Sequence, residues 1–255
     1  MFHRSIRSSP SIRYFGPLFQ KKCLSSSGME STPAPIIREL HINDKINAWK
    51  SIGFNVDSTS GVFNIGAVRL NVQETNTSSS GIVGVGFLNP FQRNIHKLDD
   101  INVWSLDKEH VRPPNGDSQH INGVYKIDHI VIKSCNIDAI HSKLVNDIGL
   151  TLRKRTSDII PGTEQLFYRE NHFSKDTPII EVIRSSSSSS LSPASVWGIS
   201  FVVPCLNQLR DAIGHSHTSD IRVAKQQGRE ICTLRKSALL STQVAFMTPH
   251  NGKTH

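Results

Sequence analysis

The chain has 255 residues, of which 37% are hydrophobic and 20% are charged. This length and composition fit one large folded domain or two small ones, and they exclude a mini-protein and a disordered tail. The apolar runs are far shorter than the roughly 20 residues of a membrane-spanning helix, and the four cysteines form no Cys-x-x-Cys pair. We therefore expect a soluble protein of a reducing compartment.

Most of the formal net charge of +8 lies at the N-terminus. Residues 1–29 contain five Lys and Arg side chains and no acid, so this segment carries +5 and the rest of the chain +3. The remainder therefore lacks the basic stripe that is typical of nucleic-acid binding. A segment rich in Ser and Arg and without acids is typical of an organellar transit peptide. We predict a transit peptide over 1–30 and the mitochondrial matrix as the location, with a disordered basic terminus as the alternative.

The first folded module is predicted over 31–90. A strand at 36–42 leads into a short helix whose apolar side chains share one face and which ends at Gly53. Three strand-like runs then follow, at 62–65, 68–72 and 82–88. The segment 91–124, which contains a Pro-Pro-Asn-Gly turn, is predicted to be a linker.

The same order of elements recurs twice over 125–250. Each of these copies begins with a strand and continues with an amphipathic helix that ends at Gly149 or Gly214. Strand-like runs follow each helix, at 150–154, 165–169 and 179–183 in the second copy and at 221–224, 230–234 and 244–247 in the third. The repeated unit is βαβββ, which predicts an α+β fold built of repeated modules.

The opening and closing strands of these copies carry a family resemblance. The runs Ile127-Asp128-His129-Ile130-Val131-Ile132 and Pro178-Ile179-Ile180-Glu181-Val182-Ile183 resemble the first and last strands of a module in the vicinal-oxygen-chelate (VOC) superfamily, the glyoxalase-like fold. The runs 197–204 and 226–231 are similar to further segments of such proteins. The resemblance covers about residues 36–250. It implies that βαβββ modules curl into a half-barrel cup, and that the second and third copies pair into one VOC domain over 125–250.

The resemblance also implies a metal site. In this superfamily a divalent metal is usually held by one side chain on the first strand and one on the last strand of each module. His129 and Glu181 occupy these positions in the second copy, which implies Zn, Mn, Fe or Ni and gives Glu181 the role of moving a proton. A half-buried imidazole bonded to the backbone is the alternative for His129.

The other copies depart from this pattern. The third copy has Gly198 and Ala245 at the two positions, while the first copy has Ile37 on its first strand and no acid over 82–88. Half of a metal site is therefore visible, and catalytic sites usually supply about three protein ligands. Further ligands would have to come from another subunit or from distant histidines, namely His41, His120 or His172.

Four residues are candidates for substrate binding. Gln165 and Arg169 share one face of a strand by the period of two, although Arg169 also fits a solvent-facing position. His120 precedes the second copy near the expected rim of the cup, where a simple Asn-Gly turn is the alternative. Arg229 enters a strand of the third copy and is a candidate to hold a carboxylate or phosphate.

Two classes of function remain. One is a metal-dependent lyase, isomerase or epimerase acting on a small oxo-acid or thioester-type substrate. The other is a metal-free VOC protein that binds a small molecule or acts as a scaffold with a degenerate site. The expected partner is a small molecule, and neither nucleic acid nor a membrane.

Three modules leave one without a partner in a fold whose modules normally pair. The first copy would then dock on the edge of the other two, pair with the segment 91–124, or match a second subunit. Because an uncovered sheet edge promotes association, we predict a homodimer.

Overall fold

The computed structural model of the chain describes residues 34–75, 79–89, 91, 93–107, 119–160, 162–170, 177–184, 192–225 and 228–250. The predicted transit peptide over 1–30 lies outside these residues. Within them, no helix has both the length and the apolar character needed to cross a membrane.

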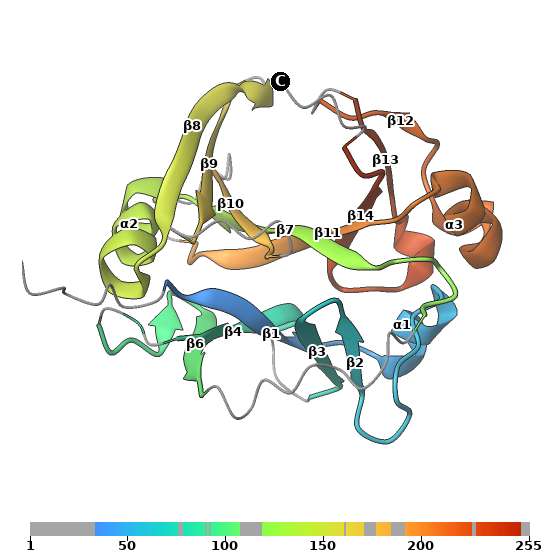
Figure 1. Ribbon diagram of the computed structural model, residues 1–255, viewed down its shortest axis with the longest axis horizontal. Coiled ribbons are helices and arrows are strands. Elements are labelled where there is room, and N and C mark those ends of the chain that lie inside the picture. Colours follow the sequence, from blue (N-terminus) through green and yellow to red (C-terminus); the bar gives the residue numbers. More distant parts are fainter. Residues whose placement is uncertain are drawn as a thin grey trace, which may run out of the picture. The chain divides into compact units, whose positions relative to one another are not determined.

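Two β-sheets form the folded part of the chain (Figure 1). The N-terminal sheet has six strands in the order β2-β3-β1-β4-β6-β5. Its strands are β1 (Ile36–Asn43), β2 (Val62–Ile65), β3 (Val68–Gln73), β4 (Gly81–Leu88), β5 (Lys97–Leu98) and β6 (Ile101–Leu106). The helix α1 (Ile46–Ser51) connects β1 to β2.

The C-terminal sheet has eight strands in the order β12-β13-β14-β11-β7-β10-β9-β8. Its strands are β7 (Lys126–Ser134), β8 (Thr151–Ile160), β9 (Thr163–Arg169), β10 (Ile179–Arg184), β11 (Ser195–Val202), β12 (Arg222–Val223), β13 (Glu230–Thr233) and β14 (Gln243–Met247). The helices are α2 (Ile137–Ser142), which continues into a π-helical turn (Lys143–Ile148), and α3 (Leu206–Ile213). In Figure 1 the strands β7 and β11 form the floor, and β8–β9 and β12–β13 rise on either side of it, so this sheet is curved. The expected α+β fold with a curved sheet of βαβββ modules is confirmed.

Local sequence explains where the helices begin and end. The side chain of Asn136 accepts a hydrogen bond from the amide of Ala139 at 3.1 Å and so caps α2. Gly53 and Gly149 have φ angles of 83° and 97°, in the left-handed region where glycine is favoured after a helix. The glycine stops predicted from the sequence are therefore confirmed.

The first module differs from the expected arrangement. In the second module the last strand, β10, pairs parallel with the first strand, β7. In the N-terminal sheet it is β3 that pairs parallel with β1, whereas β4 pairs antiparallel with β1. The strand β4 is therefore not the last strand of the first module, although its sequence 82–88 was assigned that role. Alternation along a strand cannot reveal this, because it is the same for parallel and antiparallel partners.

The strand β4 instead begins a fourth, reduced module. It pairs parallel with β6, which pairs antiparallel with β5. Both strands lie within 91–124, the segment predicted to be a linker. The first module thus has a partner within the chain, as one of the alternatives held, and the reason for predicting a homodimer does not hold.

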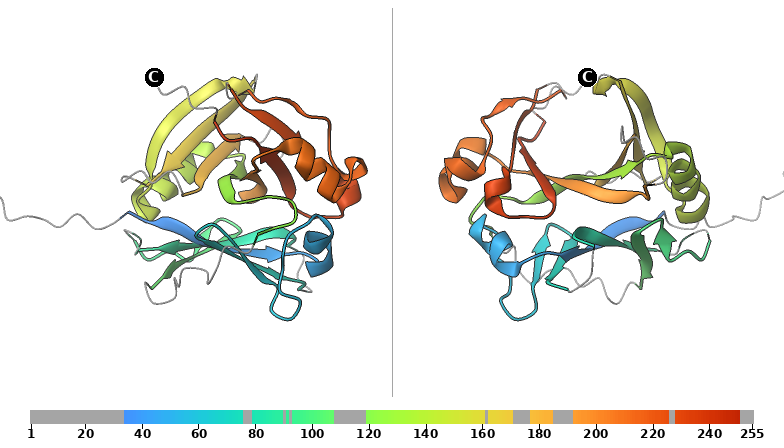
Figure 2. Two further views of the ribbon diagram at one scale, coloured as in Figure 1. Left: turned by 45° about the vertical axis from the view of Figure 1, so that its right-hand side comes forward. Right: turned by 180° about the vertical axis from the view of Figure 1, so that it is seen from behind.

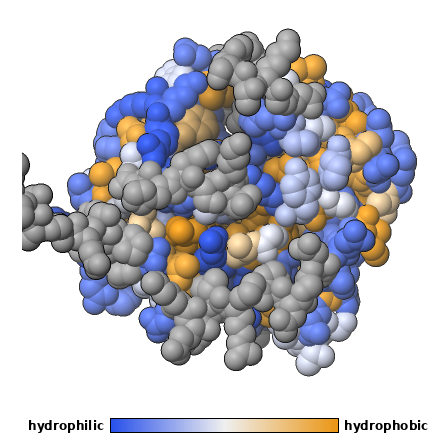
Figure 3. Space-filling model, in the orientation of Figure 1, coloured by the Kyte–Doolittle hydropathy of each residue, from blue (hydrophilic) through white to orange (hydrophobic). Residues whose placement is uncertain are grey.

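One hydrophobic core joins the two sheets. Phe201 of β11 is fully buried, and the centroid of its ring lies 5.2 Å from that of Phe54 and 6.5 Å from that of Trp49, both from the N-terminal half. Figure 2 shows the two sheets stacked in two further views. On the face of the molecule drawn in Figure 3, polar and apolar residues are interspersed.

Two carboxylates, the buried Asp44 and the partly buried Asp99, add hydrogen bonds across the same boundary. Asp44, which follows β1, accepts hydrogen bonds from the indole of Trp49 at 3.3 Å and from the amide of Ser241 at 3.0 Å. Asp99, between β5 and β6, accepts from Lys143 at 2.7 Å and from the amide of Ala194 at 3.1 Å. The N-terminal sheet thus supports the floor of the C-terminal sheet from its convex side.

We expect Phe201→Ala to lower the free energy of unfolding by about 3–5 kcal/mol, because the deletion leaves a cavity where the two sheets meet. Urea unfolding followed by circular dichroism measures this. The matched control is Val223→Ala, at a side chain that is 79% exposed, which should change the value by less than about 0.5 kcal/mol. Equal effects of the two changes would contradict the shared core.

Candidate functional site

Four polar side chains from four strands meet on the concave face of the C-terminal sheet. They are His129 of β7, Gln165 of β9, Glu181 of β10 and Ser200 of β11, and each is at most 9% exposed. The Ser200 hydroxyl lies 2.9 Å from Nε2 of His129, and Oε2 of Glu181 lies 3.5 Å from the same nitrogen. Gln165 donates a hydrogen bond from Nε2 to Oε1 of Glu181 at 2.5 Å. The structure thus brings together His129, Glu181 and Gln165, three of the residues singled out in the sequence.

The register of the strands explains this meeting. His129 pairs with Ser200 across the antiparallel β7–β11 ladder. Glu181 pairs with Val131, and period two places Val131 on the same face as His129. Side chains on this face of the floor therefore point into the curve of the sheet, away from the core below.

A β-bulge adds a further group that sequence reasoning missed. The β7–β11 register shifts between the pairs Ser200–His129 and Phe201–Ile127, so Asp128 has no partner residue on β11. Period two would place Asp128 on the face opposite to His129, but Oδ2 of Asp128 lies 2.8 Å from Nδ1 of His129. The only sequence signal was the acid next to the histidine.

Arg229 holds Asp128 in place. Its Nη1 donates to Oδ1 of Asp128 at 2.8 Å, and its Nε donates to the carbonyl oxygen of Thr248 at 2.7 Å. Burial opposes ionisation of Asp128, but the hydrogen bond with His129 and the charge of Arg229 together hold its pKa well below the ordinary value. Arg229, expected to hold a substrate anion, is occupied with an internal carboxylate and is 3% exposed.

The ionised Asp128 orients the imidazole of His129. A carboxylate can only accept hydrogen bonds, so Nδ1 of His129 carries a proton that it donates to Asp128, and Nε2 is the ring nitrogen left for another partner. This nitrogen points toward Ser200 and Glu181. A carboxylate behind a histidine is the usual arrangement for orienting a metal-binding imidazole.

The cluster supplies some of the ligand atoms that a bound metal ion needs. Nε2 of His129 and Oε2 of Glu181 are lone-pair donors 3.5 Å apart, near the roughly 3–3.5 Å that separates two ligands of one small cation. Gln165 and Ser200 offer an amide and a hydroxyl beside them. In the part of the chain that the structure describes, no three His, Cys, Asp or Glu side chains converge on one point.

The pairing of the third module confirms which of its residues replace the two ligands. Ser200 pairs with Ala245 as Val131 pairs with Glu181, so Ala245 is the equivalent of Glu181. Gly198 stands two residues before Ser200, as His129 stands two before Val131. A Cβ atom at Gly198 would lie 2.8 Å from the carbonyl oxygen of Gln243, so no side chain fits there without a backbone shift.

The remaining candidates lie elsewhere. His120 is 5% exposed and lies in the segment before β7, packed against the N-terminal half, where Nδ1 accepts from the amide of Asn55 at 3.1 Å and Nε2 lies 2.9 Å from the carbonyl oxygen of Asn64. Burial lowers the pKa of His120, which suits a neutral core imidazole. His41 is in the N-terminal sheet, and His172 lies outside the described residues.

Arg169 lies near the cluster in a partly buried position on β9. Burial lowers the pKa of its guanidinium, while the carboxylates of Asp128 and Glu170 act in the opposite direction. Arg169 therefore interacts electrostatically with the carboxylate of Asp128, which is consistent with a position beside the cluster.

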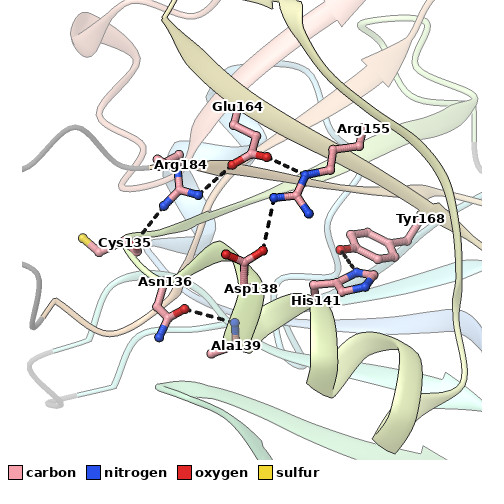
Figure 4. A network of polar contacts seen from close by, with 9 residues as sticks. All are labelled: Cys135, Asn136, Asp138, Ala139, His141, Arg155, Glu164, Tyr168 and Arg184. Atoms are coloured by element: carbon pink, nitrogen blue, oxygen red, sulfur yellow. Dashed lines mark hydrogen bonds and ion pairs between the residues drawn. The ribbon is translucent and has the colours of Figure 1, made fainter.

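An ion-pair network on the outer side supports the strands that carry Gln165 and Glu181. Glu164 of β9 accepts hydrogen bonds from Arg155 of β8 at 2.5 Å and from Arg184 of β10 at 2.6 Å, and Arg155 also reaches Asp138 of α2 at 3.1 Å (Figure 4). The network links three neighbouring strands to the helix. Its members are largely exposed, so it contributes alignment more than stability.

Comparisons with known proteins identify the fold. No protein-family model matches the chain, and no curated protein matches it in sequence. Among solved structures, a Mn(II)-bound glyoxalase from Novosphingobium aromaticivorans aligns with 87% of this chain and 84% of its own, with a TM-score of 0.57 and 9% identity. A variant of 4-hydroxymandelate synthase from Streptomyces coelicolor aligns with 88% of this chain and 95% of its own, with a TM-score of 0.57 and 13% identity.

A methylmalonyl-CoA epimerase from Mycobacterium tuberculosis aligns with 50% of this chain and 89% of its own, with a TM-score of 0.40 and 12% identity. The two likenesses that extend over most of the chain include both sheets, and at such identities they speak for the fold alone.

We expect the stability of this protein to fall in acid partly through Asp128. Its pKa is lowered on folding from an ordinary value of 3.8, so its ionised form stabilises the fold above about pH 4, and this contribution is lost as the pH falls further. Asp128→Asn should therefore lower the free energy of unfolding at pH 7 by about 1–3 kcal/mol and flatten its decline between pH 5 and pH 3. Urea titrations at several pH values measure this, with Asp100→Asn, at an exposed carboxylate, as the control that keeps the original slope.

Proposed function

Because this chain has the fold of the vicinal-oxygen-chelate superfamily, we propose that the concave face of its C-terminal sheet is a site for metal-assisted proton transfer. The reaction would be that of a lyase, isomerase or epimerase on a small oxo-acid or thioester-type substrate. The observation that carries the proposal is the buried chain of contacts from Asp128 through His129 to Glu181 and Gln165.

Each residue of this chain has a distinct part. His129 and Glu181 would hold a divalent cation through Nε2 and Oε2, and such a cation supplies polarisation of the substrate oxygens. Asp128 fixes the ring of His129, and Arg229 fixes Asp128. Gln165 holds the second oxygen of Glu181 and so orients the carboxylate.

Glu181 is the group that would move the proton. A hydrogen on the carbon next to a carbonyl group is removed as a proton by the carboxylate, which returns it to the same or a neighbouring atom. The electron pair left on carbon is delocalised onto the carbonyl oxygen. Burial of Glu181 at 8% exposure keeps bulk water from the transferred proton.

Metal binding on this fold has a precedent in the glyoxalase neighbour, which is described as Mn(II)-bound. The donors in the present chain are one imidazole, one carboxylate, one amide and one hydroxyl. Imidazole with oxygen donors suits Zn, Mn, Fe or Ni. The chain leaves the remaining coordination positions to water and substrate.

A metal-free binding protein is the second candidate. The observation in its favour is the third module, where Gly198 and Ala245 replace the two ligands and the strand at Gly198 has no room for a side chain. In that case His129, Glu181 and Gln165 form a polar cluster that hydrogen-bonds a small ligand.

We expect the full-length protein, purified without chelators, to contain close to one divalent metal per chain. Glu181→Gln should reduce metal affinity more than tenfold because a charged ligand is lost, and Asp128→Asn should reduce it about 10- to 100-fold through the orientation of His129. Elemental analysis and calorimetric titration with Mn²⁺ and Zn²⁺ measure both.

Glu230→Gln is the matched control, because Glu230 is an exposed carboxylate on β13 of the same sheet. It should keep the metal content of the original protein. Absence of metal in all four proteins, with no uptake on titration, would contradict the metal-assisted reaction and leave the ligand-binding alternative. A Glu181→Gln protein that retains full affinity would show that the metal is bound elsewhere.

A further inference from the structure

The N-terminal sheet repeats the central pairing of the C-terminal sheet. In each sheet two antiparallel strands form the middle, and each of these strands has one parallel partner. Each central pair also contains two register shifts. Glu39 pairs with Gly86 directly after the first shift, as His129 pairs with Ser200 beside the shift at Asp128. Glu39 is thus the equivalent of His129.

The same equivalence identifies a second position. His41 stands two residues after Glu39 and pairs with Asn71 of β3, as Val131 pairs with Glu181 of β10. Asn71 is therefore the equivalent of Glu181. The repeat seen in the sequence predicted Ile37 as the equivalent of His129 and the run 82–88 as the strand that would carry the equivalent of Glu181. The register of β1 and its parallel pairing with β3 give Glu39 and Asn71 instead.

The side chains at these positions form a compact polar group on the outward face of the N-terminal sheet. Nε2 of His41 lies 3.3 Å from Oε1 of Glu39, and the ring of Trp104 lies 4.4 Å from that of His41, centroid to centroid. A Cβ atom at Gly84 or Gly86 would lie 2.6 or 2.7 Å from an atom of the indole, so a side chain at either position would displace Trp104 from its place.

A small cavity of about 110 Å³ opens beside this group. His41 and Asn71 line it together with Ile42, Asn43, Gln73, Thr75 and Val83. Oδ1 of Asn71 is buried and accepts no hydrogen bond. A buried oxygen without a donor is destabilising unless a ligand satisfies it.

We propose that His41, Glu39 and Asn71 form a second binding site for a divalent cation, on the N-terminal sheet. Nε2 of His41, Oε1 of Glu39 and Oδ1 of Asn71 supply one nitrogen and two oxygens, a donor set that suits first-row divalent ions. The 3.3 Å between the first two atoms matches two ligands on one cation, which lie roughly 3–3.5 Å apart. Water would fill the remaining positions from the cavity.

The charges at the site agree with this assignment. The hydrogen bond with His41 lowers the pKa of Glu39 against the effect of burial, and the charges of His41 and Arg69 act in the same direction. Glu39 is therefore ionised at neutral pH.

Trp104 makes the site observable. The centroid of its ring lies 4.4 Å from that of His41, so a paramagnetic ion such as Co²⁺ bound there would quench its fluorescence. Trp49 is buried in the core, and Trp197 lies on β11 of the other sheet. We therefore use a Trp197→Phe protein as the background for titration with CoCl₂ at pH 7.5, with the fold of every variant checked by circular dichroism.

We expect saturable quenching by one equivalent of Co²⁺. His41→Gln should weaken the affinity for Co²⁺, read from the quenching curve, more than about tenfold. Asn71→Asp should strengthen this affinity, because a carboxylate then replaces the amide as a ligand. His96→Gln is the matched control, since His96 is an exposed histidine of the same half of the chain and should leave the curve unchanged.

His129→Gln separates this site from the one in the C-terminal sheet. Quenching that persists in His129→Gln and disappears in His41→Gln supports the second site whether or not the C-terminal sheet binds metal. Absence of saturable quenching in the background protein, unchanged quenching in His41→Gln, or loss of quenching in His129→Gln would each overturn it. Because Asn71→Asp is expected to act in the opposite direction to His41→Gln, a general loss of structure cannot produce the expected pattern.

Discussion

The antiparallel pairing of β7 with β11 is the constraint on which the candidate site depends. It places His129 opposite Ser200, and the bulge next to that pair turns Asp128 toward the same imidazole. The parallel pairing of β10 with β7 then brings Glu181 within 3.5 Å of Nε2 of His129. A shift of one residue in either ladder would turn these side chains into the core and bring apolar ones to the concave face.

The core beneath this floor fixes its shape. Side chains that alternate with the site residues along the same strands, such as Ile130 and Phe201, are fully buried, and Phe201 packs against aromatic residues of the N-terminal half. The N-terminal sheet, β1 to β6, therefore supports the site, and none of the site residues identified above comes from its described strands. The two structural neighbours that align with most of the chain include both sheets.

The two sheets share a pairing plan but have diverged in the side chains at its centre. The C-terminal sheet carries His129 and Glu181, and the N-terminal sheet carries Glu39 and Asn71 at the equivalent positions. Within each sheet, one of the two equivalent ligand sites lacks ligand side chains. Gly198 leaves no room for a ligand in one, and Trp104 covers Gly84 and Gly86 in the other. Each sheet keeps polar side chains at the other site, on one central strand and on the parallel neighbour of that strand.

The sequence by itself determined most of the strands, the glycine-terminated helices and the repeated module, because these follow from side-chain period and turn chemistry, which are local. The pair His129–Glu181 was assigned from the resemblance to the VOC superfamily, and the strands β5 and β6 were not predicted. The sequence did not reveal Asp128 beside His129, the role of Arg229 as the partner of Asp128, or the packing of His120 against the N-terminal half. These depend on a bulge and on contacts between residues about 100 positions apart. Nor did it reveal that β4 begins a fourth module, since alternation is the same for parallel and antiparallel neighbours. Strand order and register are set by packing of the whole core, and only the tertiary structure decides them.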